Sequence, residues 1–139
     1  MKKLCLFFTI FSYSLFAQYE QYDGDWKGSG KFIGSTNSFL CESYQISINI
    51  RGDSLKITDG QYTCKRKTTK IADRNLFIKG NDLLNNNDKI VGSISLKKII
   101  IKDSFPSYEL FISRFESNLF VIESDITTEK EEIMIGILD

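Results

Sequence analysis

The sequence predicts an all-β protein folded as a single antiparallel domain. Apolar and polar residues alternate over short runs, and clusters of Gly, Asn, Asp and Ser separate these runs. The chain has one proline and no long helical period. About eight such runs fit one domain of this length. They can close into an up-and-down β-barrel, which leaves no exposed sheet edge, and a two-sheet β-sandwich is the alternative.

The first 17 residues predict a secretory signal peptide. Lys2 and Lys3 precede an apolar run from Leu4 to Phe16, and Ala17 is a small residue suited to signal-peptidase cleavage. The run is too short to span a bilayer. We therefore expect an exported protein, periplasmic or secreted, whose mature domain covers residues 18–139 without an integral membrane segment. A membrane anchor that is never cut is the alternative.

The charge balance argues against nucleic acid as a partner. The whole chain carries 18 basic and 18 acidic residues, so the loss of Lys2 and Lys3 leaves 16 basic against 18 acidic, a net charge of −2. A dedicated nucleic-acid binder needs a basic surplus. Histidine is absent, which removes the usual general base and the commonest metal ligand. We expect no metal and no cofactor, and the sequence points away from an enzyme.

Alternation assigns the strands and their faces. The first strands turn one set of side chains inward, namely Trp26, Gly28, Gly30 and Phe32, then Tyr44, Ile46, Ile48 and Ile50, then Leu55 and Ile57 after a turn over 51–54. Further strands are predicted at 74–79, 89–102, 107–115, 118–127 and 131–138. The run Ile99–Ile101 interrupts alternation and predicts a bend, a bulge or burial on both faces. The polar stretch Asn81–Asp88 predicts a mobile loop.

The sequence shows no visible catalytic pair of carboxylates; the alternative is that two acids converge in the fold, as glycoside hydrolysis needs. The acidic residues of the predicted strands and turns fall at outward or turn positions, namely Glu42, Glu109, Glu116, Glu123 and Asp125. Lys65, Arg66, Lys67 and Lys70 form a basic patch that either meets an anionic partner or simply charges an edge strand or loop.

Two cysteines of the mature domain are predicted to form a disulfide. In a hairpin that turns between Gly52 and Asp53, the numbers of opposite residues sum to 105, and Cys41 and Cys64 satisfy this sum. Opposed Cα atoms lie about 4.5–5.5 Å apart, within disulfide range. A bulge at Asp59-Gly60 would shift this register by one residue. Export to an oxidising compartment favours the bond.

Gly24-Asp25-Trp26, continued as Trp26-x-Gly28-x-Gly30, resembles the first strand of lipocalin-like proteins. The resemblance implies an up-and-down barrel with Trp26 closing one end and an interior that takes a small apolar ligand. The Trp-x-Gly-x-Gly run also resembles nitrobindin-like barrels, but their haem-binding histidine has no counterpart here.

Two functions follow as hypotheses. The first is an exported barrel that binds a small apolar ligand, with Trp26, Phe32 and Tyr44 at the barrel end or lining the ligand site. The second is a non-enzymatic structural or interaction protein with a solid core, acting through its surface. The volume enclosed by the barrel distinguishes them, because ligand-binding barrels enclose about 300–1,000 Å³.

Overall fold

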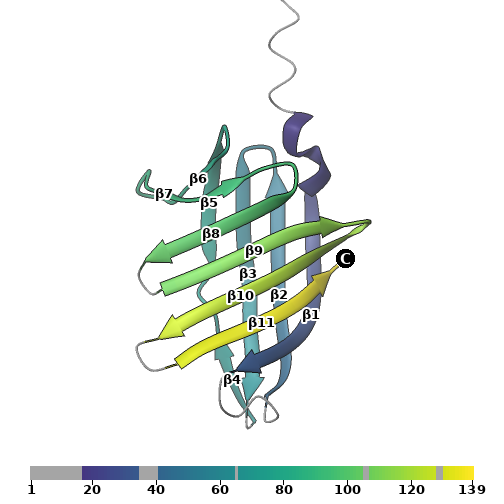
Figure 1. Ribbon diagram of the computed structural model, residues 1–139, viewed down its shortest axis with the longest axis vertical. Coiled ribbons are helices and arrows are strands. Elements are labelled where there is room, and N and C mark those ends of the chain that lie inside the picture. The colour runs from purple at the N-terminus through teal and green to yellow at the C-terminus, as the bar shows by residue number, and fades with distance from the viewer. Residues whose placement is uncertain (1–16, 35–40, 65, 105–106, 128–129) are drawn as a thin grey trace, which may run out of the picture.

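The computed structural model describes residues 17–34, 41–64, 66–104, 107–127 and 130–139, and side chains are described except at 17–18, 32–34, 41–42, 64, 104, 107, 125–127 and 130–132. A short 3-10 helix, η1 (Ala17–Tyr22), precedes the strands (Figure 1). The strands of the described residues are β1 (Gly24–Gly34), β2 (Cys41–Arg51), β3 (Ser54–Cys64), β4 (Lys67–Lys70), β5 (Arg74–Lys79), β6 (Asp82–Leu84), β7 (Ile90–Ile94), β8 (Lys98–Ser104), β9 (Ser107–Phe115), β10 (Asn118–Thr127) and β11 (Lys130–Leu138).

These strands form one antiparallel sheet that closes into an up-and-down barrel. Strands that follow each other in the chain pair in the sheet, except that β4 and β5 both pair with β3. β11 pairs with β1, and the pairing of β2 with β3 completes the ring. Figure 1 shows β8 to β11 crossing in front of β1 to β3 as two walls of this barrel. The predicted barrel is thus confirmed, and closure excludes the sandwich.

The ring has ten strands, where the sequence predicts about eight. β4 and β5 count as one, because both pair with β3 in the same register: Gln61 opposes Lys70, and Ser54 opposes Phe77. The predicted strand 89–102 is two strands, separated by a turn in which Ser95 N donates to the Lys98 carbonyl at 2.9 Å. The predicted loop Asn81–Asp88 contains β6, which is only three residues long.

The hairpin of β2 and β3 has the predicted register at both ends and a shift between them. Ile50 opposes Leu55 and Cys41 opposes Cys64, but the pairing shifts by one residue between Ser47 and Gln45 and shifts back before Cys41. The first shift falls at Asp59-Gly60, as anticipated, and Asp59 has a left-handed φ of 55°. The opposing second shift restores the cysteine pairing.

The core fills the barrel with alternating inward side chains. Residues such as Ile48, Leu55, Ile99 and Leu119 are at most 1 % exposed. Ile99 and Ile101 point inward while Ile100 is half-buried on the outer side, and all three pair regularly with β9. The predicted irregularity at Ile99–Ile101 is therefore wrong, because ordinary alternation continues through three isoleucines.

Glycines in β1 allow a close approach to β11. A Cβ atom at Gly30 would lie 1.8 Å from the carbonyl oxygen of Ile135, and one at Gly28 would lie 2.0 Å from that of Ile137. Real side chains do not tolerate such distances from backbone atoms, so the Trp-x-Gly-x-Gly run is needed where the barrel closes.

Helix η1 covers the upper end of the barrel in Figure 1. Tyr22 is fully buried there, and its carbonyl accepts a hydrogen bond from Trp26 Nε1 at 2.8 Å. Arg114 donates to the Gln21 carbonyl, and its guanidinium lies 5.8 Å from the centre of the Trp26 ring. Among the described helical residues, none forms a helix long and apolar enough to cross a membrane.

Candidate functional site

A carboxylate lies inside the barrel, within the otherwise apolar core. Glu123 on β10 is 0 % exposed, and two tyrosines donate hydrogen bonds to its two oxygens. Tyr44 on β2 donates to Oε2 at 2.5 Å, and Tyr108 on β9 donates to Oε1. The prediction that Glu123 faces outward is wrong, because it follows Leu119 and Val121 on the inward side of β10. Glu109 and Glu116 are exposed as predicted, and the side chains of Glu42 and Asp125 lie outside the described part.

The core holds Tyr44 in place for this contact. Its ring is fully buried and lies against Gly136 on β11, where an added Cβ would be 3.1 Å from Tyr44 Cε1. That distance is tighter than most real contacts, so a larger residue at 136 would push the phenol away from Glu123. The missing side chain at Gly136 therefore makes room for the aromatic donor.

Both phenols remain donors across the physiological pH range. Burial raises the pKa of Tyr44 and of Tyr108, and the negative charge of Glu123 raises both pKa values further. Arg74 opposes this shift at Tyr108 without cancelling it. Protonated phenols donate hydrogen bonds and are poor bases, so both tyrosines act as donors to Glu123 and not as proton acceptors.

Arg74 extends the cluster toward the barrel wall. Its guanidinium lies 3.7 Å from the centre of the Tyr108 ring, and Nη1 donates to Asp103 Oδ2 at 3.0 Å. Both partners of this ion pair are mostly buried, with side chains 13 % and 23 % exposed. The pair joins β5 to β8, although β6 and β7 lie between these strands in the sheet.

A window in the wall explains how β5 can reach β8. β6 and β7, which lie between β5 and β8 in the sheet, have only three and five residues. Beside the loop that joins them is a hollow of about 210 Å³ lined by Asp73, Arg74, Asn75, Leu76, Asn85, Asn86, Asn87 and Asp103. Asn85 shapes its rim, because its Oδ1 accepts hydrogen bonds from the backbone of Asn87 and Lys89. We call this hollow the window.

One buried hydrogen-bond donor at the window lacks an acceptor within the described part of the chain. Arg74 Nε is buried and has no hydrogen-bond partner among the described residues. A buried donor without an acceptor costs about 1–3 kcal/mol, and more when it is charged. We call Tyr44, Tyr108, Glu123, Arg74 and Asp103 the polar cluster; Arg74 Nε is its one buried donor without an acceptor among the described residues.

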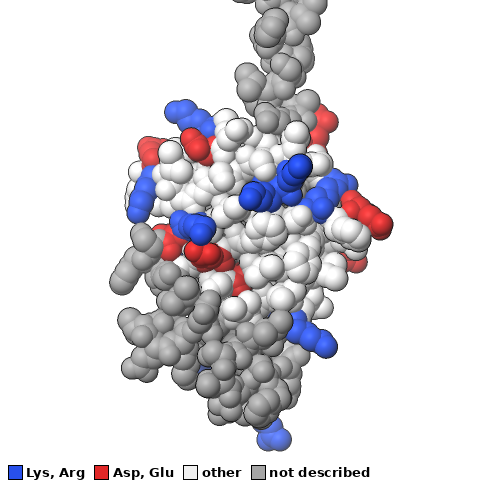
Figure 2. All heavy atoms as spheres, viewed as in Figure 1, with Lys and Arg blue, Asp and Glu red and all other residues white. Residues whose placement is uncertain are grey.

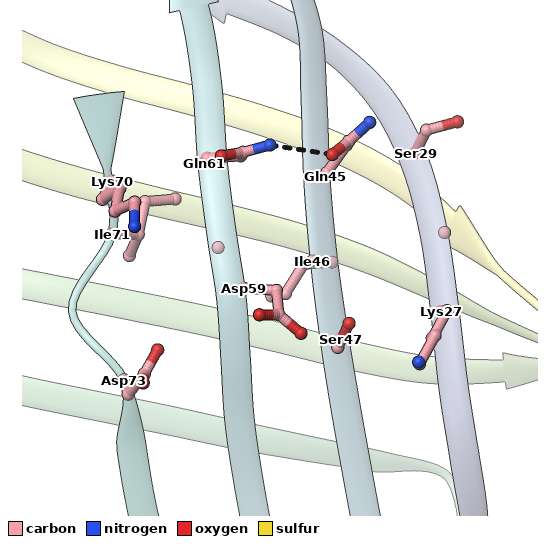
Figure 3. Close-up of a pocket in the computed structure, with 12 residues that line it drawn as sticks. Lys27, Ser29, Gln45, Ile46, Ser47, Asp59, Gln61, Lys70, Ile71 and Asp73 are labelled. Atoms are coloured by element: carbon pink, nitrogen blue, oxygen red, sulfur yellow. Dashed lines mark hydrogen bonds between the residues drawn. The ribbon is translucent and has the colours of Figure 1, made fainter. Parts of the chain in front are cut away.

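A second hollow lies on the outer side of the barrel. Figure 3 shows it over β1, β2 and β3 and the junction of β4 with β5, with a volume of about 670 Å³. Gln61 Nε2 donates to Gln45 Oε1 across its upper edge at 2.9 Å. Its charged side chains, Lys27, Asp59, Lys70 and Asp73, are all exposed and balance in sign. Water satisfies such groups, so this hollow is the weaker candidate.

The structure separates the predicted site residues. Trp26 opposes Ile48 at the end covered by η1, whereas Tyr44 opposes Gly30, two inward positions further along β1. The side chain of Phe32 lies outside the described residues. Of the basic patch, Lys65 also lies outside them, Arg66 and Lys67 are exposed, and Lys70 borders the outer hollow. β4 pairs only with β3 among the described strands, which favours the interpretation of a charged sheet edge.

The Cys41–Cys64 disulfide stays a prediction, since the structure fixes the backbone pairing and the cysteine side chains are not described. Mass spectrometry under non-reducing conditions should show the two residues linked in exported protein. Cys41→Ala should lower the free energy of unfolding by about 2–4 kcal/mol, because the open chain gains entropy when unfolded. Two alkylatable thiols in that protein would show that the bond is not formed.

Comparisons with protein families, with curated proteins and with solved structures find no match to this chain. Among the described residues, no group of three or more Cys, Asp or Glu side chains is placed to hold a metal ion.

Proposed function

We propose that this protein is an exported β-barrel that binds a small, largely apolar ligand carrying one hydrogen-bond acceptor. The observation that carries the proposal is the buried Arg74 Nε, which has no acceptor among the described residues. A ligand carboxylate or carbonyl at this atom would satisfy it. The lipocalin-like features of β1 and the closed barrel support the same function.

The window gives such a ligand a way to the polar cluster. Its acceptor would reach Arg74 beside Tyr108, and its apolar part would contact Leu76, the one apolar residue that lines the window. At about 210 Å³ the window is smaller than the usual range of about 300–1,000 Å³ for ligand pockets. It therefore suits a small molecule or the end of a chain.

The second candidate is a structural or interaction protein with a solid core. The observation in its favour is the close filling of the described interior by apolar side chains, 22 of which are buried. Packed interiors hold few voids larger than a water molecule. In this case the polar cluster serves only to stabilise the barrel, and a ligand probe should find no site.

Titration with a fluorescent fatty acid distinguishes the two candidates. We expect saturable, one-to-one binding by the wild type and about 10–100-fold weaker binding by Arg74→Met, because a charged hydrogen bond is lost. Arg51→Met is the matched control, since Arg51 pairs with Asp25 in an exposed position. Equal binding by the wild type and Arg74→Met, or no saturation at all, would contradict the proposal.

A further inference from the structure

The outer face of β8 to β11 is apolar, which is unusual for a sheet face turned toward water. Ile100, Phe111, Ile122 and Ile135 oppose one another in register and form a row across all four strands. Along each strand these residues alternate with core residues that point inward, and their own side chains are partly exposed. We define the outer apolar face as Ile100, Phe111, Phe115, Phe120, Ile122, Ile133, Ile135 and Ile137.

Two residues of this face are largely exposed to solvent. Phe115 is 69 % exposed and Ile137 is 58 % exposed. With Phe120, Ser113 and Asn118 they line a shallow hollow of about 410 Å³. An exposed apolar patch of this kind marks a contact surface for a protein or a membrane.

Lysines border the outer apolar face on both sides. Lys98 and Lys102 stand on either side of Ile100 on β8, and Lys27 and Lys31 are exposed on β1 at the opposite edge. Figure 2 shows a central white area largely free of charge on this side of the molecule, with both basic and acidic groups around it. Lys102 pairs with Glu109 at 3.0 Å, and Glu116 and Asp139 add acidic groups at the ends of strands.

This arrangement disfavours contact between two copies of the chain. A two-fold pairing that keeps the strands of the two copies aligned brings a lysine-bearing edge against another lysine-bearing edge. Like charges in such an interface repel each other. A negatively charged surface, by contrast, is attracted by both edges at once.

We propose that the outer apolar face docks on an anionic lipid surface. Phe115, Phe120 and Ile137 enter the region of the acyl chains, while the flanking lysines extend their ammonium groups to the lipid phosphates. The backbone amides and carbonyls of β9, β10 and β11 are paired on both sides within the sheet. Contact with hydrocarbon therefore leaves no backbone group of these strands without a partner.

Vesicle flotation tests the proposal. Every form is prepared with the same processed N-terminus, because the apolar run Leu4–Phe16 would itself bind lipid. We expect binding to vesicles that contain phosphatidylglycerol, and binding at least about tenfold weaker to pure phosphatidylcholine or in about 0.5 M salt. The double variant Phe115→Ser/Ile137→Ser should lose about tenfold or more in binding to the anionic vesicles.

Matched variants distinguish docking from nonspecific adhesion. Phe77→Ser removes an aromatic side chain that is 51 % exposed on β5, outside the face, and should leave binding unchanged. Lys31→Glu/Lys98→Glu should abolish binding, whereas Lys56→Glu/Lys79→Glu on other strands should reduce it much less. Thermal unfolding of each variant confirms that it is folded.

Three results would overturn the proposal. The first is absence of wild-type binding to anionic vesicles, and the second is equal binding by the wild type and Phe115→Ser/Ile137→Ser. The third is a concentration-dependent dimer in sedimentation experiments that the same double variant abolishes, which would assign the face to self-association.

Discussion

Glu123→Leu should lower the free energy of unfolding by about 2–6 kcal/mol, because each of two buried donors that lose their acceptor costs about 1–3 kcal/mol. The change leaves the phenols of Tyr44 and Tyr108 buried and without their acceptor. Glu123→Gln keeps the shape and one acceptor oxygen, so it should cost less, about 1–3 kcal/mol. Chemical denaturation at neutral pH measures both values.

A combined variant separates stability from function in the polar cluster. Adding Tyr44→Phe and Tyr108→Phe to Glu123→Leu removes the stranded donors, so much of the lost stability should return. If the triple variant is stable but no longer binds the fluorescent fatty acid, the polar cluster serves ligand binding and not only the stability of the barrel. A Glu123→Leu protein as stable as the wild type would contradict the role assigned to the carboxylate.

Trp26→Ala should cost about 3–5 kcal/mol, as truncation of a packed aromatic side chain does. The indole packs against the core at the end covered by η1, and its Nε1 donates to the Tyr22 carbonyl. Because Trp26 is the chain's single tryptophan, its fluorescence also reports directly on this end of the barrel. Loss of the ring should release η1 from the barrel.

Two variants check that this effect belongs to the covered end. Trp26→Phe keeps an aromatic ring but loses the hydrogen bond to Tyr22, at a cost of about 1 kcal/mol for the bond. Phe77→Ala removes an exposed aromatic side chain and should change stability by no more than about 0.5 kcal/mol. Similar losses for Trp26→Ala and Phe77→Ala would mean that Trp26 does not close the barrel.

Local sequence patterns predicted most of the barrel because, in a half-buried strand, apolar residues that point inward alternate with polar residues that point outward. The inward face of Tyr44 to Ile50 and the pairing of Cys41 with Cys64 could both be read from residue spacing. β6 could not, because three residues are too few to show alternation. The division between β7 and β8 lacked a signal as well, since the turn at Ser95 contains neither Gly nor Pro.

The polar cluster was missed for a different reason. Leu119, Val121 and Glu123 share one face of β10 by simple alternation, so the spacing did contain the signal. Acidic residues are almost never fully buried unless paired, so an inward position alone does not indicate that a carboxylate is buried. The partners Tyr44 and Tyr108 lie 79 and 15 residues away in the chain, so only the closed barrel brings them to Glu123.

The contact between Arg74 and Asp103 was equally hidden. The ion pair spans the window beside the short strands β6 and β7. No local sequence pattern predicts the lengths of these two strands or the pairing of Arg74 with Asp103. Residues that are distant in the chain meet there because the sheet closes. Alternation within a single strand does not predict that contact.

Native mass spectrometry of the protein purified from its own host tests the proposed ligand most directly. We expect a species heavier than the mature polypeptide by the mass of one small molecule, which collisional activation releases. We also expect that Arg74→Met, purified in the same way, carries much less of that molecule than Arg51→Met. Wild-type protein that shows only the mass of the polypeptide, under conditions gentle enough to keep the barrel folded, would contradict the account.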